Sequence, residues 1–234
     1  MRKKILIITC VLVLFTLISC SRRNAYYDYL DVKTYGDFLY TNKNIDGGLS
    51  IIGLTKEGKE KEVIVFPAYI EGKPVVCLGS HVNYEAYGEI DTRLVRKIYF
   101  PSTYKYHYVD LKLSSNNTAI FYGGESWFFI NFVNVGTNTF LSNNSKSFYD
   151  SIRYSEPTES KLKISTVEYH MEEKTYFVDN VESGKIEVVP PTPYKDELVF
   201  DGWYIGDTKW DFDTMKVEDY FNDQNRLILE AKWK

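Results

Sequence analysis

The sequence predicts a mainly β protein, in which a short stack of repeated strands precedes a small second β domain. Segments 63–79 and 95–109 each begin with β-forming residues that end in Phe-Pro, and the two Phe-Pro pairs lie 34 residues apart. A proline that ends a strand removes no ladder hydrogen bond, so strands recurring with such a proline are typical of a stacked solenoid. Residues 227–233 alternate apolar and polar side chains, which predicts a further strand near the end of the chain.

The N-terminus has the pattern of an export signal. Basic residues at 2–4 precede an apolar run of 14 residues at 5–18, which is shorter than the roughly 20 residues of a membrane-spanning helix. The letters LISC at 17–20 resemble the lipobox of bacterial lipoproteins. The resemblance implies that residues 1–19 are removed and that Cys20 carries a lipid anchor. The alternative is an ordinary secretory signal with an incidental cysteine.

The net charge and the cysteine content limit the classes of function and partner that the sequence supports. Loss of 1–19 removes three basic residues and no acidic one, so the formal net charge changes from −4 to −7. That charge disfavours nucleic acid and an electrostatic attraction to anionic lipid. The predicted location is therefore the outer face of the cytoplasmic membrane, the bacterial cell surface, with the lipid as anchor. Cys77 is then the one free thiol, so apolar burial rather than a disulfide must hold the fold.

The next segments are a tether and the start of the repeat region. Residues 20–37 are polar and tyrosine-rich, which predicts a tether between membrane and fold. The repeat region is placed at 38–136. It opens with two strand-like runs around a turn signal, which predicts a β-hairpin. The turn signal consists of Asn44, Asp46, Gly47 and Gly48.

The repeated segments resemble the BspA-like leucine-rich repeats of bacterial surface proteins. The matching residues are Gly72, Lys73, Pro74, Val75, Leu78 and Gly79, then Val95, Ile98, Phe100 and Pro101 in the next rung. The resemblance implies a short β-solenoid-like leucine-rich repeat stack over about residues 38–124, with a degenerate third rung at 117–124. The spacing exceeds that of the family because of an insertion within 80–93. The aromatic stretch 126–136 is the expected cap strand.

Residues 137–163 are rich in Ser, Thr, Asn and charged side chains, which predicts an interdomain linker. Residues 164–234 then resemble the Listeria–Bacteroides repeat, the β-grasp-like B-repeat of internalins. The matches are Gly184, Pro190, Pro193, Phe200, Gly202, Trp203, Tyr204, Trp210, Asp211, Phe212, Leu229, Ala231, Lys232 and Trp233. One departure is Glu197, which stands where the family has glycine. If that position requires a positive φ, Glu197 strains the turn or forces a different one.

The tryptophans of this domain are expected to be structural. A domain of about 70 residues needs large aromatic side chains inside to bury enough apolar area. We therefore expect Trp203 and Trp233 in the core, whereas Trp210 fits a core or a ligand platform equally well. Period-two alternation places Phe200 and Gly202 on the strand face opposite to Trp203.

Candidate chemistry is sparse. His81, His107 and His170 lack metal-ligand spacing, and Cys77 lies in an apolar strand, where an inert thiol is expected. The pair Asp211 and Asp213 is a candidate for paired carboxylates or calcium, but Asp211 belongs to the structural motif and no bidentate glutamate follows. We expect no catalytic residue, no metal and no cofactor.

The expected function is non-enzymatic: display, adhesion or protein–protein interaction at the cell surface, with an unknown extracellular macromolecule as partner. The candidate binding residues are Tyr104, Tyr106 and Tyr108 in the segment YKYHY, on a repeat face around 99–109. The alternative is a carbohydrate-binding lipoprotein that uses these tyrosines and Trp127, and a hydrolase is the third candidate. Nucleic acid is not expected.

Overall fold

The structure is a computed structural model of the chain. It describes residues 30–43, 45, 47–79, 89–92, 94–107, 110–113, 118–124, 132–133, 139–142 and 166–234. These residues form β-strands and two short 3₁₀ turns, Gly58–Glu60 and Val217–Asp219, so the mainly β prediction is confirmed. No helix in the described part of the chain has the length and apolar character needed to cross a bilayer. The signal 1–19, Cys20, Tyr108 and Trp127 lie outside the described residues.

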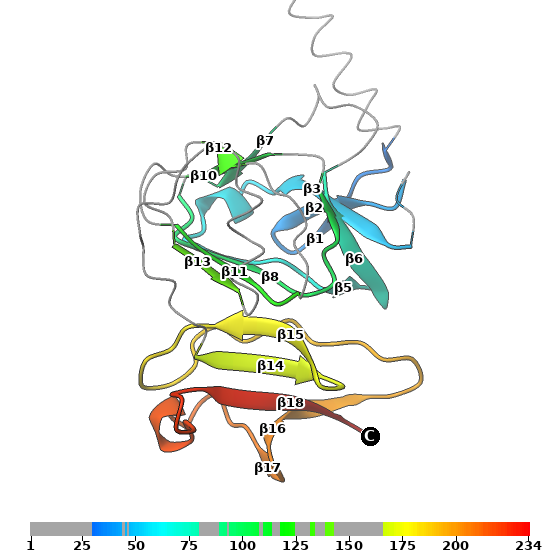
Figure 1. The fold of residues 1–234 in the computed structure, drawn as a ribbon. Coiled ribbons are helices and arrows are strands. Elements are labelled where there is room, and N and C mark those ends of the chain that lie inside the picture. Colours follow the sequence, from blue (N-terminus) through cyan, green and yellow to red (C-terminus); the bar gives the residue numbers. More distant parts are fainter. Residues whose placement is uncertain are drawn as a thin grey trace, which may run out of the picture.

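The described residues between 30 and 142, here called the N-terminal unit, begin with a mixed sheet. Its strand order is β1-β2-β3-β6-β5 (Figure 1), and β9 pairs parallel with β6. The strands are β1 (Lys33–Tyr35), β2 (Phe38–Thr41), β3 (Leu49–Leu54), β5 (Tyr69–Ile70), β6 (Lys73–Leu78) and β9 (Tyr106–His107). β2 and β3 pair antiparallel, which confirms the predicted hairpin.

The tether prediction is wrong for residues 30–37. Leu30 is fully buried in the core, and β1 pairs antiparallel with β2 in a register that places Tyr35 opposite Phe38. The two-residue connection Gly36-Asp37 turns the chain, and glycine supplies the positive φ of 53° that such a tight turn requires. Asp37 then fixes the hairpin to the body of the unit by an ion pair with Lys61 at 2.5 Å.

Parallel ladders make up the rest of the N-terminal unit. One has the order β13-β11-β8-β4, and another has the order β12-β10-β7. Their strands are β4 (Val63–Val65), β8 (Lys97–Phe100), β11 (Ala119–Tyr122), β13 (Thr139–Ser142), β7 (Glu89–Thr92), β10 (Asp110–Leu113) and β12 (Phe132–Val133). The register aligns Ile64, Ile98 and Ile120 in one column. Both Phe-Pro pairs, 66–67 and 100–101, stand at the ends of these parallel strands, as predicted.

The linker prediction fails at its start. Residues 139–142, inside the predicted linker 137–163, form β13 and pair parallel with β11. The sequence there is Thr-Phe-Leu-Ser, whose first two residues are β formers. A polar composition on either side concealed this short strand.

Residues 166–234, the C-terminal unit, form one five-stranded sheet in the order β15-β14-β18-β16-β17. Its strands are β14 (Val167–Met171), β15 (Lys174–Asp179), β16 (Phe200–Ile205), β17 (Thr208–Lys209) and β18 (Leu227–Trp233). The first and last long strands, β14 and β18, lie side by side and parallel, whereas their outer neighbours are antiparallel. Leu227 and Leu229 are buried on one face of β18, as the alternation predicts.

The tryptophan predictions are confirmed for Trp203, which is buried, and the structure decides the open case by burying Trp210 as well. Trp233 is half-buried and meets the ring of Phe200 edge-on at 5.6 Å. Phe200 also contacts Trp203, with ring centroids 5.4 Å apart. The prediction that these two side chains face opposite ways is wrong, because a β-bulge between Phe200 and Gly202 shifts the register.

The two units share a hydrophobic core. One apolar cluster lies within the N-terminal unit, but the second joins the aromatic core of the C-terminal unit to Ala68, Tyr99 and Phe121 of the N-terminal unit. Tyr99 stacks between Phe121 and Phe177, with ring centroids at 4.3 and 5.3 Å. Accordingly, β15 is the strand of the lower sheet nearest the parallel strands β8, β11 and β13 (Figure 1).

Hydrogen bonds also join the two units where their shared core lies. The Tyr99 hydroxyl donates to Asp179 Oδ1 at 2.8 Å, and the Ser102 amide donates to the Tyr176 carbonyl at 2.9 Å. Gly123 packs so closely on the Tyr176 backbone that a Cβ at this position would overlap the carbonyl group. The two units therefore form one packed body rather than two independently placed domains.

Candidate binding cleft

A cavity of about 270 Å³ lies where the two units meet. Its lining residues are Tyr35, Phe38, Val65, Pro67, Tyr69, Val189, Pro191 and Thr192. The first five belong to the N-terminal unit and the last three to the C-terminal unit. This volume is just below the range of about 300–1,000 Å³ typical of small-molecule pockets, so the cleft fits one short segment or a single ring of a larger partner.

The N-terminal wall follows from two tight turns. Tyr35 ends the exposed edge strand β1, and 47% of its surface is accessible. Pro67 and Tyr69 follow β4, and a two-residue turn at Glu71-Gly72 connects β5 to β6. Glu71 has a φ of 52°, the left-handed conformation that a turn of this kind demands.

The opposite wall is a proline-rich segment, 188–194, that belongs to none of the strands. The Tyr176 hydroxyl donates to the Pro191 carbonyl at 3.1 Å. Tyr194 lies against the backbone of Gly72, and its ring centroid is 5.6 Å from that of Tyr69. Val189 and Tyr194 keep 56% and 43% of their surface exposed, so the cleft opens onto an apolar rim.

The electrostatics of the cleft are simple, because none of its lining residues carries a charged side chain. Burial, and then the nearby Asp196 carboxylate, raise the pKa of Tyr69. A hydrogen bond to the same carboxylate raises the pKa of Tyr194. Both phenols are therefore neutral hydrogen-bond donors at physiological pH, and the site offers rings and hydroxyls rather than charge.

The tyrosines predicted as a binding stripe do not share one exposed face. Tyr104 is fully buried, donates its hydroxyl to the Pro67 carbonyl at 3.2 Å and packs edge-on against Phe66 and Phe100. It precedes β9, in the turn after Pro101, so strand alternation does not apply to it. Tyr106 is exposed over 51% of its surface. Tyr99, on the same predicted face, is covered by the C-terminal unit.

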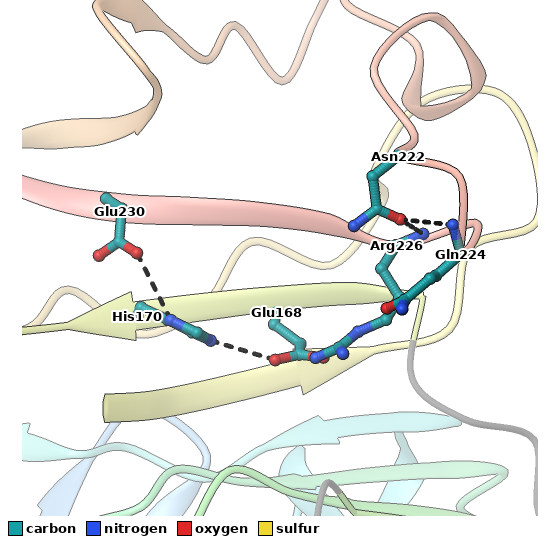
Figure 2. Close-up of polar contacts among 6 residues, drawn as sticks. All are labelled: Glu168, His170, Asn222, Gln224, Arg226 and Glu230. Atoms are coloured by element: carbon teal, nitrogen blue, oxygen red, sulfur yellow. Dashed lines mark hydrogen bonds and ion pairs between the residues drawn. The ribbon is translucent and has the colours of Figure 1, made fainter. Parts of the chain in front are cut away.

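The polar network in Figure 2 joins neighbouring strands of the C-terminal sheet. Glu168 and His170 project from β14 and Glu230 from β18, with His170 Nε2 3.1 Å from Glu168 and Nδ1 3.4 Å from Glu230. Both ring nitrogens of His170 therefore face carboxylates of neighbouring residues, and the arrangement is that of a structural polar network.

Arg226 completes this network by donating to Glu168, and the Asn222 carboxamide oxygen accepts from the backbone amides of Gln224 and Arg226 (Figure 2). Burial alone would raise the pKa of Glu168, but the hydrogen bonds from His170 and Arg226 outweigh burial and lower it. Glu168 is therefore a buried, ionised and fully paired carboxylate.

Asp211 and Cys77 have structural surroundings. The Asp211 carboxylate caps its own turn, because it accepts from the Asp213 amide at 2.8 Å and from the Thr214 hydroxyl at 2.7 Å. Burial raises the pKa of the Cys77 thiol to about 11, which leaves it protonated and unreactive. Within the described ranges, no three His, Cys, Asp or Glu side chains lie close enough to share a metal ion.

Comparison of the chain with models of known protein families, with curated proteins and with solved structures gave no match. The cleft was not found from the sequence, although two signals for it exist. These are the Gly36-Asp37 turn, which makes β1 a strand, and the run of prolines at 190–193.

Proposed function

We propose that the protein is a non-enzymatic, lipid-anchored surface protein that binds an extracellular protein through the cleft between its two units. The observation that carries this proposal is the gathering of uncharged aromatic, proline and hydroxyl side chains from both units at one opening. Aromatic side chains are enriched and charged ones depleted at the centres of protein interfaces. Tyr35 and Tyr69 are the titratable side chains of the cleft lining, and burial raises the pKa of Tyr69 further from the neutral range that favours acid–base catalysis.

The architecture behind this proposal is a short leucine-rich-repeat-like solenoid followed by a β-grasp-like domain. Support for the first comes from the parallel columns: Ile98 aligns with Ile120, and Ile90 aligns with Leu111. These offsets of 22 and 21 residues lie within the 20–29 residues of a leucine-rich repeat, whereas the offset of 34 residues between Ile64 and Ile98 is longer. Support for the second comes from the central parallel pair β14–β18, flanked by antiparallel strands, which is the β-grasp strand arrangement.

The anchor is tested at Cys20. Replacement by alanine should release the protein from the membrane fraction or leave the signal uncleaved. Continued recovery of a processed protein in the detergent phase would contradict the lipid anchor.

The binding role is tested with the full-length protein, purified in mild detergent and immobilised. We would measure saturable binding of proteins from envelope and host extracts to the wild type, to Tyr35→Ser and to Tyr106→Ser. The two tyrosines are similarly exposed, but only Tyr35 lines the cleft. Binding lost in Tyr35→Ser and kept in Tyr106→Ser supports the cleft. Binding equal in all three, or lost only in Tyr106→Ser, overturns it.

A further inference from the structure

We propose that the cleft recognises an extended, proline-containing segment of its protein partner, bound in the polyproline II conformation. This inference rests on the proposed function and adds the chemical class of the ligand.

The chain's own proline-rich segment, 188–194, forms one wall of the cleft. Pro190 and Pro193 are buried, whereas Pro191 and Thr192 between them remain partly or fully accessible. Residues three apart share a face in a polyproline II helix, which has three residues per turn and no internal hydrogen bonds. The segment belongs to none of the strands, and a hydrogen bond from Tyr176 to the Pro191 carbonyl holds it. Tyr194 of the same segment packs against Tyr69 of the N-terminal unit, with ring centroids 5.6 Å apart, so a proline-flanked aromatic side chain already contacts this surface.

The side chains that line the open cleft have the same aromatic and proline character. The rings of Tyr35 and Tyr69 and the pyrrolidine of Pro67 line the cleft. Aromatic-lined grooves of this composition are the general receptors for proline-rich segments, because the ligand is extended before binding and loses little conformational entropy. The hydroxyl groups of Tyr35, Tyr69 and Thr192 add donors for the carbonyl groups that a polyproline II helix leaves unbonded.

The lining also argues against other ligand classes. A buried sugar ring needs partners for several hydroxyl groups, yet the lining contains no Asp, Glu, Asn, Gln, Arg or Lys side chain. A polyanion would find no cation there and would approach a chain whose mature net charge is negative. An uncharged segment with few donors is the ligand that the uncharged cleft complements.

The test is a titration of the full-length protein, in mild detergent, with an oligoproline peptide. A glycine–serine peptide of the same length and a neutral oligosaccharide serve as probes of the other chemistries, and calorimetry gives the dissociation constants. We expect saturable binding of oligoproline in the range of about 1 mM or tighter, and at least about tenfold weaker binding of the other two probes.

Substitutions of single tyrosines then locate the oligoproline-binding site. Tyr35→Ser should weaken oligoproline binding about tenfold, Tyr35→Phe should retain most of it because the ring remains, and Tyr106→Ser should leave it unchanged. Tyr35 lies half-exposed on an edge strand, so melting temperatures of all three variants should match the wild type. Equal binding by Tyr35→Ser and the wild type, or stronger binding of the oligosaccharide than of oligoproline, overturns the inference.

The two proposals fail in different ways. If a protein partner is lost in Tyr35→Ser but oligoproline does not bind, the ligand class is wrong and the proposed function stands. If neither ligand responds to Tyr35→Ser, the cleft itself is wrong.

Discussion

The two units bury different polar groups, although both are built from strands around an apolar core. The buried polar side chains in the described part of the N-terminal unit carry only hydroxyl groups. They are those of Thr41, Ser50, Thr92 and Thr118. The C-terminal unit buries two carboxylates, Glu168 and Asp179. A hydroxyl group needs one partner and does not titrate, whereas a buried carboxylate depends on paired charges or shifts its pKa. Among the described residues, the buried carboxylates and the pH dependence that they confer therefore lie in the C-terminal unit.

The two units also differ in whether their own residues complete their hydrophobic core. The N-terminal unit fills one cluster from its own ladders, with Phe66 stacked on Phe100 at 4.5 Å. The C-terminal core is completed by Tyr99, Phe121 and Ala68 from the other unit. A unit of about 70 residues has little interior volume. Packing against the aromatic side chains of the N-terminal unit therefore adds to the apolar area that it buries. The stability of the C-terminal unit should thus depend on the N-terminal unit.

The largest expected effect is at the centre of the shared core. Trp203 packs against Tyr169 at 5.0 Å and Tyr176 at 5.9 Å. Trp203→Ala should lower the free energy of unfolding by about 3–5 kcal/mol, measured by urea denaturation with near-ultraviolet circular dichroism. The half-buried Trp233 is the matched control, and Trp233→Ala should cost clearly less. A small effect at Trp203 would show that the aromatic cluster is not the C-terminal core.

Glu168 tests how far a buried, paired carboxylate stabilises the C-terminal unit. Glu168→Gln should lower the free energy of unfolding by about 2 kcal/mol at neutral pH, because Arg226 and His170 lose their anionic partner. The folded-state pKa of Glu168 is lowered. Its stabilising contribution is therefore fully present above its ordinary value of 4.5 and is lost as the pH falls through the folded-state pKa.

The measurement is the melting temperature of wild type and Glu168→Gln between neutral and acidic pH. The gap between the two proteins should shrink as the pH falls below 4.5. A gap that stays constant over this range would mean that the carboxylate contributes by packing rather than by charge.

Asp179 sharpens the comparison because its pKa moves in the opposite direction. Burial raises the pKa of Asp179, and the hydrogen bonds from Tyr99 and the Asn180 amide only partly offset this rise. The group stabilises the fold most at low pH, and stability falls as the pH rises from its ordinary value of 3.8 through the folded-state value. Asp179→Asn keeps an acceptor for Tyr99 without a charge, so it should raise the free energy of unfolding at neutral pH by about 1 kcal/mol.

Tyr99→Phe is the companion variant, since it removes the donor and leaves the buried carboxylate with one partner fewer. It should destabilise the protein by about 1–3 kcal/mol at neutral pH. Chemical denaturation at neutral and acidic pH compares the two variants. Destabilisation by Asp179→Asn at neutral pH would show that the charge itself holds the units together.

Local patterns predicted several strands of each unit, but not β1, β13 or the packing of the units against each other. The Phe-Pro pairs correspond to strand ends because proline cannot donate to a ladder, and the 227–233 alternation corresponds to β18 because successive side chains of a strand point to opposite faces. The burial of Tyr104 follows from a turn that removes it from strand alternation, and the Phe200–Trp203 contact follows from a bulge. The cleft joins residues more than 150 positions apart, such as Tyr35 and Pro191, and no pattern within one segment encodes that pairing.

The smallest expected effect concerns a single turn before β16. Glu197 has a φ of 64°, a left-handed conformation that costs a residue with a Cβ about 1–2 kcal/mol. This agrees with the expectation that Glu197 strains its turn if the position requires a positive φ. Glu197→Gly relieves that cost but adds freedom to the unfolded chain. We expect a net gain of about 0.5 kcal/mol, read as a higher urea midpoint with an unchanged slope.

Lys216 provides the matched control, because it is exposed and has an ordinary φ of −114°. Lys216→Gly gains no relief of strain and should lower the free energy of unfolding by about 0.5–1 kcal/mol. Opposite signs for the two glycine variants would assign the difference to backbone conformation. If Glu197→Gly is as destabilising as Lys216→Gly, the left-handed turn is not strained, and the loop before β16 is held by contacts of the Glu197 side chain instead.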